Sequence, residues 1–290
     1  MIIVKLIGGL GNQMFQYAIG RHIAEKNNIE FKLDITEFEI YDLHKYSLNH
    51  FNIIEKLASN DEIYKFNLRK NFEKIFNKIN LYSGKKYIKE KKFAFNEKLL
   101  KIKNNAYIDG YWQSEKYFKK IENIIRKEFV INKAQSAKNK EVTNMIKECN
   151  SISIHIRRGD YINNKHTSQL HNTCGLDYYN RTIDYINKNN KNPHFFVFSD
   201  DPQWAKDNLK TELPIYFIDN NNVNTNYEDL RLMSQCNHNI IANSSFSWWG
   251  AWLNNNPDKI VIFPRTWFND RSIETKDLIP KKWTAINNAN

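Results

Sequence analysis

The fold is decided by a short segment at residues 151–161, which reads SISIHIRRGDY. Serine, histidine and arginine alternate with isoleucine along it, which is typical of a β-strand with one polar and one apolar side. Four further strand-like segments follow, separated by helix-length stretches, at residues 194–199, 215–219, 238–243 and 259–264. This order predicts a parallel sheet with crossover helices.

Polar clusters end three of these strands and predict a binding site. They read HIRRGDY at residues 155–161, FSDD at residues 198–201 and NSSFSWW at residues 243–249. Ligands of parallel α/β sheets bind outside the carboxyl ends of the strands. A strand inside such a sheet is normally apolar on both faces, so we expect the polar side of residues 151–157 to line a cleft.

A length of 290 residues allows two domains, each with its own core. The chain begins with a strand, the turn GGLGN, a helix over residues 13–26 and a strand over residues 30–34. The pattern then becomes mostly helical and basic, and a helix near residues 116–127 closes this half. We expect an α/β fold of two Rossmann-like β/α domains, residues 1–135 and 136–290, facing each other across a cleft.

The composition is typical of a globular protein of the cytoplasm. The hydrophobic fraction is 41%, and no apolar run approaches the roughly 18 residues of a membrane span. The N-terminus lacks the basic start and cleavage site of a secretory signal. The three cysteines are scattered without C-x-x-C spacing, which suits free thiols in a reducing compartment and speaks against zinc.

The formal net charge of +11 is concentrated in residues 65–103, where 13 Lys or Arg stand against 3 acids. One interpretation is a solvated lysine-rich face. The other is a patch that binds an anionic membrane surface or a lipid-linked acceptor at the inner face of the membrane. Ile63 and Phe66 recur there at helical spacing, as do Ile75, Phe76 and Ile79, which fits either an amphipathic helix or a core helix.

Two arginines follow the polar strand directly. Arginine is suited to a bidentate grip on phosphate, so Arg157 is a candidate diphosphate ligand. The alternative is an Arg–Asp ion pair, for which Arg158 and Asp160 are the candidates. His155 on the same side of the strand either contacts the ligand or is a neutral core histidine.

Ser244 and Ser245 stand where a helix begins. A helix N-terminus with hydroxyl groups binds anions, because its backbone N–H groups lack partners and the dipole is positive there. Simple N-capping explains one serine but not both. Phe246 and the neighbouring tryptophans are typical of a core, although Phe246 is also a candidate nucleotide contact.

Three acids complete the candidate site. Asp229 can accept from the ring N–H and amino group of guanine together, a pattern that selects guanine over adenine. Asp200 and Asp201 follow a strand and precede Pro202, so one of them is expected to cap a helix and both to lie near the ligand. The chain contains no Asp-x-Asp motif, so we expect Arg157 and the serine pair, without a metal ion, to neutralise a departing diphosphate.

The turn GGLGNQ has two interpretations. It nearly matches the dinucleotide fingerprint G-x-G-x-x-G, with Asp34 near the position of a ribose-binding acid, but Met14 replaces the third glycine. In the other interpretation Asn12 and Gln13 aim amide groups into the cleft.

Taken together, these motifs resemble those of the bacterial α-1,2-fucosyltransferases of glycosyltransferase family 11. The resemblance covers nearly the whole chain. It rests on GGLGNQMFQYA (8–18), DGYWQSEKYF (109–118), HIRRGDY (155–161), LDYY (176–179), FSDD (198–201) and NSSFSWWGAWL (243–253).

This resemblance implies a GT-B architecture and inverting, metal-independent transfer of L-fucose. The donor is GDP-β-L-fucose, bound by residues 136–290, and the acceptor is the 2-hydroxyl of a galactoside in a glycan or lipopolysaccharide O-antigen. Relatives in the wider superfamily imply roles residue by residue. Arg157 clamps the diphosphate, Ser244 and Ser245 bind phosphate, Asp229 binds guanine, His155 lies near the nucleotide, Asp200 and Asp201 match the paired acids that follow a strand in these relatives, and Asn12 reaches the reacting centre.

The general base is left open by the resemblance. α-1,6-Fucosyltransferases carry a glutamate where this chain has Lys165, so we rank Asp160 first as the base, with orientation of an arginine as its alternative role. Other functions stay open: α-1,6 or α-1,3 transfer, a non-catalytic nucleotide- or sugar-binding module, and nucleic-acid binding, which is prompted only by the pI of about 9.3. The oligomeric state is not indicated.

Overall fold

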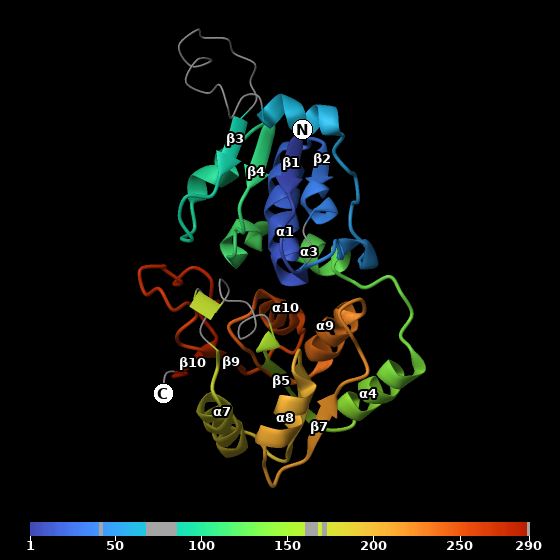
Figure 1. Cartoon of the computed structure of the whole chain (residues 1–290), viewed down its shortest axis with the longest axis vertical. Helices are drawn as coiled ribbons and strands as arrows, with labels where there is room; N and C mark the ends of the chain where they lie inside the picture. The colour runs from blue at the N-terminus through green and yellow to red at the C-terminus, as the bar shows by residue number, and fades with distance from the viewer. Residues whose placement is uncertain (41–42, 68–85, 160–167, 170–172, 289–290) are drawn as a thin grey trace. The chain divides into compact units, whose positions relative to one another are not determined.

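The computed structural model describes residues 1–40, 43–67, 86–159, 168–169 and 173–288 (Figure 1). The chain divides into two compact units, one of Met1–Asn132 with Glu274–Ile279 and one of Lys133–Ile273 with Pro280–Asn290. The expected boundary after residue 135 lies close to this division. The segment Glu274–Ile279, however, was expected in the second domain and belongs to the first unit.

The first unit contains a parallel sheet of four strands in the order β2-β1-β4-β3. Helix α1 packs on one face of it, where Gly20 permits close approach: a Cβ atom there would lie 2.2 Å from Val4 Cγ2. The strands are β1 (Ile2–Lys5), β2 (Phe31–Asp34), β3 (Lys86–Lys89) and β4 (Ala106–Asp109). The helices are α1 (Leu10–Asn27), α3 (Glu122–Glu128) and the 3₁₀ turns η1 (Thr36–Glu39), η2 (Leu48–His50), η3 (Glu97–Lys101), η4 (Glu115–Tyr117) and η5 (Lys119–Ile121).

The prediction of a mostly helical segment after residue 34 is wrong for β3 and β4. Residues 106–108 form a buried central strand that pairs with both β1 and β3. Strands of four residues are too short for hydrophobic periodicity to separate them from a helix. Long-range pairing, which a local pattern does not contain, decides their conformation.

The segment Glu274–Ile279 is fastened to the first unit through Asp277. The Asp277 carboxylate accepts the Phe95 N–H at 2.9 Å and pairs with the Lys116 ammonium, and its carbonyl accepts the Ser114 hydroxyl at 2.5 Å. Burial opposes ionisation of Asp277, but these partners hold its pKa below the ordinary value. The C-terminal part of the chain therefore supplies a structural contact to residues 95–116.

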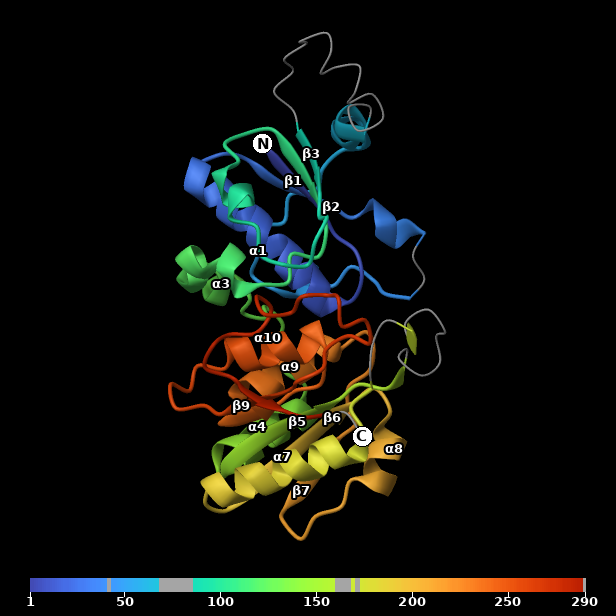
Figure 2. The same ribbon diagram turned by 90° about the vertical axis from the view of Figure 1, so that its left-hand side faces the viewer.

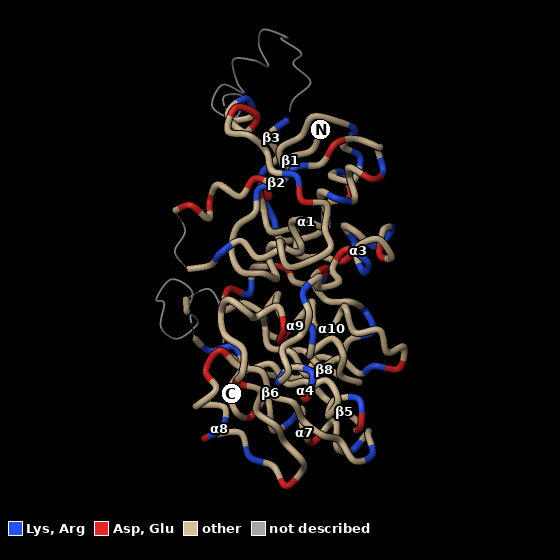
Figure 3. The backbone as a smooth tube through the Cα atoms, turned by 90° about the vertical axis from the view of Figure 1, so that its right-hand side faces the viewer, with Lys and Arg blue, Asp and Glu red and all other residues tan. Residues whose placement is uncertain are grey.

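The basic segment lies partly outside the described residues. Its described lysines at positions 86–103 are exposed, and Figure 3 shows basic and acidic residues interspersed along the backbone. Ile63 and Phe66 are buried against Ile3 and Tyr107, so this part of the segment is a core element and its apolar side is not available to a membrane. Ile75, Phe76 and Ile79 fall outside the described residues. In the described part of the chain, every helix is too short or too polar to cross a bilayer.

The second unit contains a parallel sheet of six strands in the order β10-β9-β8-β5-β6-β7. All five strands predicted for this region are present, and β10 was not predicted. The strands are β5 (Asn150–Ile156), β6 (Pro193–Ser199), β7 (Ile215–Ile218), β8 (His238–Ile240), β9 (Val261–Pro264) and β10 (Thr284–Ile286). The helices are α4 (Ala137–Lys147), α7 (Leu176–Asn189), α8 (Pro202–Asn208), α9 (Asn226–Gln235) and α10 (Ser245–Leu253).

Helices cover both faces of this sheet. Figure 2 shows α9 and α10 on one side of β5 and β6, with α7 on the other. The isoleucines of β5 pack with α7 and α8 in one core cluster. The serines of β5 face the opposite side and are also buried, with Ser151 and Ser153 at most 1% exposed.

The expectation that this polar side lines a cleft is therefore wrong for both serines. Ser153 accepts from Asn239 Nδ2 at 2.7 Å, and Ser151 donates to Asn237 Oδ1 at 2.8 Å. Asn239 also donates to the Met233 carbonyl at 2.8 Å and accepts from Asn254 at 2.8 Å. Buried polar groups are tolerated when each has a partner, and this network supplies the partners.

We expect Asn239→Ala to destabilise the second unit by about 2–5 kcal/mol, because it leaves several buried polar groups unpaired at roughly 1–3 kcal/mol each. Urea unfolding measures the loss. Asn189→Ala is the matched control, since the Asn189 amide is exposed and donates to the carbonyl of Tyr185 within its own helix. Equal stability of the two variants would contradict a structural role for the network.

Candidate functional site

Three neighbouring strands of the second sheet end in the predicted polar clusters. Strands β8, β5 and β6 are adjacent, so the loops that follow them share one edge. Arg157 Nη1 lies 3.0 Å from Asp200 Oδ2, and the rings of His155 and Phe246 are 5.6 Å apart. The structure thus brings all three clusters together.

Asp200 organises the loop after β5. Its Oδ1 accepts the backbone N–H of Arg158 at 2.8 Å, and its Oδ2 accepts that of Gly159 at 3.0 Å while pairing with the Arg157 guanidinium. A Cβ atom at position 159 would lie 2.9 Å from Asp200 Oδ2, so glycine permits this close approach. One carboxylate therefore fixes both the backbone of the loop and the direction of Arg157.

Arg158 and Asp201 have a structural role at the start of α8. Arg158 Nε lies 3.4 Å from Asp201 Oδ2, and the guanidinium carbon lies 3.8 Å from the centre of the Trp204 ring. Asp201 is the N-cap of α8 and accepts the Trp204 N–H at 3.2 Å. The alternative interpretations, an ion pair for Arg158 and helix capping for one acid, thus describe contacts that exist. Among the described residues Arg158 pairs with Asp201, and the expected partner Asp160 lies outside them.

His155 is a buried histidine whose Nδ1 has no hydrogen-bond partner among the described residues. Burial lowers its pKa to about 4, with Asp200 opposing and Arg157 reinforcing the shift, so the ring is neutral at physiological pH. An unpaired buried nitrogen costs free energy, which a hydroxyl or phosphate group of a ligand could recover. Phe246, beside His155, is partly exposed, whereas Trp248 and Trp249 are core residues.

Helix α10 begins at the same edge with its N-terminus shaped by serine. Ser244 is the N-cap, and its hydroxyl accepts the Phe246 N–H at 3.3 Å. Ser245 is the first helical residue and is partly exposed. The preceding turn is fixed by Asn243, whose amide donates to the Trp267 carbonyl at 2.9 Å. The positive end of the helix dipole makes this terminus suited to an anion.

Asp229 lies in the first turn of α9, which follows β7 at this edge. Asn221 Nδ2 donates to Asp229 Oδ1 at 2.7 Å, and Asn139 in turn donates to Asn221 at 2.9 Å. Burial raises the pKa of Asp229 to about 7, with the Asn221 bond opposing the shift. A carboxylate that has a pKa near neutral pH and accepts a hydrogen bond from an amide is typical of a binding site.

The turn GGLGN lies in the first unit and is held by two glutamines. Gln13 Nε2 donates to the carbonyls of Gly8 and Lys45 at 2.8 and 2.9 Å, and Gln16 Nε2 donates to that of Gly110 at 3.1 Å. Gln13 therefore has a structural role rather than the expected place in a cleft. Gly8 adopts a φ of +80°, which favours glycine.

Asp34, the ribose-binding acid that the dinucleotide interpretation of this turn requires, is not available to a ligand. Both carboxylate oxygens of Asp34 are engaged inside the unit: Oδ1 accepts from Thr36 N at 2.9 Å, and Oδ2 accepts from the Tyr107 hydroxyl at 2.5 Å. Asp34 is also only 2% exposed. The acid is thus a part of the local structure.

The side chain of Asn12 is oriented by a residue from the motif at 109–118. Gln113 Nε2 donates to Asn12 Oδ1 at 2.7 Å. A Cβ atom at position 8 would lie 2.7 Å from Asn12 Nδ2, so the glycine turn also restricts this amide. The direction of the Asn12 side chain is therefore set from both sides.

Glu90 supports the loop that carries Gln113, and sequence reasoning missed it. Its carboxylate accepts the N–H groups of Tyr111 and Trp112 at 2.7 and 3.2 Å. Trp112 is buried and adopts a φ of +56°, a strained conformation for a bulky residue. Glu90 stands among lysines in the basic segment, so no local pattern indicated its role.

Asp160 and Lys165 lie outside the described residues, so the structure does not place the candidate base. The described residues contain no group of three or more His, Cys, Asp or Glu side chains arranged to hold a metal ion.

The sequence matches the family model of glycosyl transferase family 11 over residues 1–287. It is 38% identical over 298 residues to an α-1,2-colitosyltransferase of Escherichia coli, covering 99% of each chain. It is 34% identical over 301 residues to the O-antigen biosynthesis glycosyltransferase WbnK of Escherichia coli, covering 94% of this chain and 97% of that protein.

Among solved structures, a mutant of Arabidopsis thaliana FUT1 in complex with GDP matches with a TM-score of 0.56 and 10% identity. The match covers 90% of this chain and 70% of that chain. The likeness shows a common α/β fold of the GT-B type, as the sequence predicted.

We expect Gly110→Ala to destabilise the first unit by roughly 1–3 kcal/mol, because overpacking forces neighbouring groups to move. The added Cβ would lie 2.4 Å from Glu90 Cβ and 2.8 Å from the Trp112 ring. Gly9→Ala is the control, since its nearest atom is 3.5 Å away. Denaturant unfolding compares the two, and an equal loss would show that the Glu90 contact is not the cause.

Proposed function

The chain is a glycosyltransferase of family 11, and from this premise we propose that it transfers L-fucose from GDP-β-L-fucose to the 2-hydroxyl of a β-galactoside. The observation that carries the proposal is the Asp200-held Arg157 at the sheet edge where α10 begins. A cation beside a helix N-terminus suits the diphosphate of a nucleotide sugar.

The reaction is a single displacement with inversion. The galactoside oxygen forms a bond to the anomeric carbon as the bond from that carbon to the β-phosphate oxygen breaks, and the electron pair leaves with GDP. Arg157 and the N-terminal amides of α10 stabilise the charge that develops on the diphosphate. Since these groups are supplied by the protein, we propose that no divalent ion is required.

The nucleotide base is assigned to Asp229. An ionised carboxylate there accepts from the ring N–H and the amino group of guanine, while Asn221 holds its Oδ1 atom. The neutral His155 and the partly exposed Phe246 are assigned to the nucleotide as well, because both face the same edge. Asp200 acts on the ligand indirectly, through Arg157.

The acceptor side is assigned to Asn12, whose amide is held by Gln113. The proton of the attacking hydroxyl must pass to a base, for which Asp160 is the first candidate. The name of WbnK favours an O-antigen glycan as the acceptor class. The exposed lysines at positions 86–103 suit an anionic lipid or lipid-linked acceptor, so we propose peripheral contact with the membrane.

A second candidate donor sugar is colitose. It is favoured by the 38% identity with an α-1,2-colitosyltransferase over nearly the full chain. Colitose is a 3-deoxy relative of fucose, so the same diphosphate and guanine contacts would serve both donors. The two donors differ at the 3-position of the sugar, so the protein groups that contact this position would select between them.

The proposal is tested by incubating the enzyme with GDP-fucose or GDP-colitose and a panel of β-galactosides, with and without EDTA. We expect an α-1,2-linked fucosyl product, identified by mass spectrometry and linkage analysis, in equal yield in both conditions. An α-1,6 or α-1,3 linkage, or exclusive use of GDP-colitose, would overturn the assigned specificity. Loss of activity in EDTA would overturn metal independence.

Arg157→Ala is expected to lower kcat/KM by roughly 10²–10³, the usual effect of removing one donor to a developing negative charge. The fold should persist, because Asp200 keeps its two backbone donors. Arg181→Ala, an exposed arginine of α7 bonded to the Asn287 carbonyl, is the control. Steady-state kinetics measure the rate, and circular dichroism measures folding. A folded Arg157→Ala variant with the wild-type rate would contradict the proposed contact between Arg157 and the diphosphate.

The affinity for GDP should weaken as pH falls through the pKa of Asp229. With that pKa raised to about 7 in the protein alone, and with guanine binding the ionised form, Kd should rise about tenfold between pH 8 and pH 6. The β-phosphate also titrates, so the comparison is with Asp229→Asn, which retains only the phosphate effect. Calorimetry at both pH values showing the same change in both proteins would argue against the guanine contact.

A further inference from the structure

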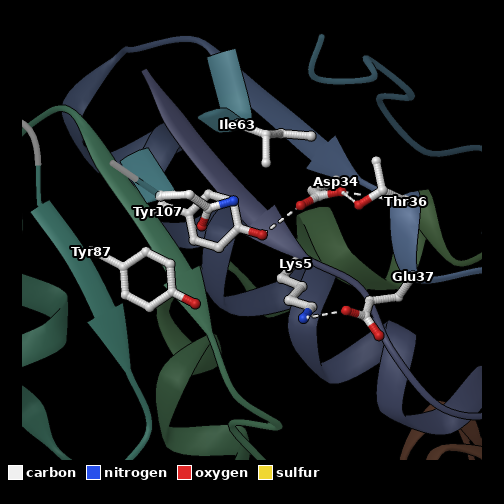
Figure 4. Close-up of a pocket in the computed structure, with 8 residues that line it drawn as sticks. Lys5, Asp34, Thr36, Glu37, Ile63, Tyr87 and Tyr107 are labelled. Atoms are coloured by element: carbon white, nitrogen blue, oxygen red, sulfur yellow. Dashed lines mark hydrogen bonds and ion pairs between the residues drawn. The ribbon is translucent and has the colours of Figure 1, made fainter. Parts of the chain in front are cut away.

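A polar pocket of about 340 Å³ lies in the first unit, apart from the residues assigned to the reaction (Figure 4). Its volume is within the usual range of small-molecule sites, roughly 300–1,000 Å³. The described residues that line it come from all four strands, from η1 and from a segment that is helical over residues 60–67. They are Lys5, Asp34, Thr36, Glu37, Ile63, Asn67, Tyr87 and Tyr107.

The pocket lies on the face of the sheet opposite α1. Val4 and Phe31 face α1, since a Cβ atom on Gly20 would collide with both. Lys5 and Asp34 are the next residues along from Val4 and Leu33 and are paired in register, so they point to the other face. Asn12 belongs to the first turn of α1 and does not line the pocket, so the pocket is separate from the residue assigned to the acceptor.

The pocket has a buried floor and an accessible rim. Asp34 and Tyr107 are each 2% exposed and are joined by a hydrogen bond of 2.5 Å. Above them Lys5 and Glu37 form an ion pair of 2.7 Å, and their side chains are 21% and 29% exposed. The floor is thus fixed by the fold, while the rim presents charged groups that a ligand can reach.

Two tyrosines add an aromatic wall. The rings of Tyr87 and Tyr107 are stacked, with centroids 5.0 Å apart and planes 13° from parallel. Burial, followed by hydrogen bonding and the charge of Asp109, raises the pKa of Tyr87. Burial and the charge of Asp34 raise that of Tyr107. Both phenols are therefore neutral and donate to carboxylates: Tyr107 to Asp34 and Tyr87 to Asp109 at 2.5 Å.

This chemistry narrows the class of ligand. Among the described lining residues one lysine stands against two acids, so this part of the lining disfavours a phosphate or carboxylate ligand. In the described part of the lining Ile63 is the one aliphatic side chain, which disfavours a lipid tail. Carboxylate, ammonium, amide and hydroxyl groups beside aromatic rings suit a neutral ligand whose hydroxyls alternate with C–H surface, namely a sugar.

We propose that this pocket is a subsite for an uncharged sugar residue of the acceptor glycan, away from the residue that receives the transferred sugar. The inference rests on the proposed function for the identity of the glycan. Lys5 and Glu37 would bind its hydroxyls, and the tyrosine wall would contact its ring. Glycans long enough to reach the pocket would then bind more tightly than short ones that end in the same galactoside.

The test compares two acceptors with the same terminal disaccharide, lacto-N-biose and lacto-N-tetraose. In the double variant Lys5→Met/Glu37→Gln the rim loses its charges at nearly constant volume. We expect KM for the tetrasaccharide to rise roughly tenfold or more, the effect of losing a charged hydrogen bond, with kcat and the KM values for lacto-N-biose and GDP-fucose unchanged. An unchanged KM for the tetrasaccharide would overturn the subsite, as would equal KM values for the two acceptors in the wild type.

A matched control is available in the same unit. Lys32 and Glu62 form an ion pair of 2.7 Å with side chains 19% and 24% exposed, and neither lines the pocket. Lys32→Met/Glu62→Gln should leave all constants unchanged. The same rise in KM in this control would overturn the assignment to the pocket.

Saturation-transfer NMR without donor separates failure of the subsite from failure of the proposed function. If neither acceptor is fucosylated, the proposed function fails. Contact signals from the inner sugars of lacto-N-tetraose that vanish in Lys5→Met/Glu37→Gln would still support the subsite. Signals that persist unchanged in the double variant would overturn the subsite. Displacement of these signals by the polyamine spermidine would also overturn it, because the pocket would then prefer a cation to a sugar.

Discussion

The carboxylate of Asp200 is the constraint on which the donor site depends. It sits after β6 and binds the loop after β5 at three points: the Arg157 guanidinium and the N–H groups of Arg158 and Gly159. Because these strands are adjacent and parallel, the acid and the loop meet at one edge. An arginine held in this way has lost its freedom before a ligand arrives, so less entropy is lost on binding a phosphate. The neighbouring Arg158, which pairs with Asp201 and stacks on Trp204, secures the same loop from its other side.

Much of this site could be predicted from the sequence because Arg157 and Asp200 directly follow strands of seven residues. The segments around β5 and β6 alternate or run apolar over several residues, and the rule for parallel sheets then places Arg157, Asp200 and Ser244 at one edge. The contacts of Asp200 could not be predicted, since an acid after a strand fits a helix cap or a ligand contact equally well. In the structure, Asp201 caps the helix and Asp200 holds the loop.

Other features depend on contacts between residues far apart in the chain. The buried serines of β5 need Asn237, Asn239 and Asn254 as partners, and the pattern of β5 alone suggested a cleft. Strands β3 and β4 have four residues each; β4 is fixed by pairing with β1, and β3 by pairing with β4. Glu90 supports the loop through which Gln113 orients Asn12. Its neighbours in the sequence are mostly lysines, so no local pattern indicated this role.

The most direct measurement of the central claim is a crystal structure of the protein with GDP. The account predicts that the diphosphate contacts the Arg157 guanidinium and the N-terminal amides of α10, with guanine paired to the carboxylate of Asp229. The Arg157–Asp200 ion pair should persist, since it positions the cation rather than competing with the ligand. Nucleotide density away from residues 157, 229, 244 and 245 would contradict the account.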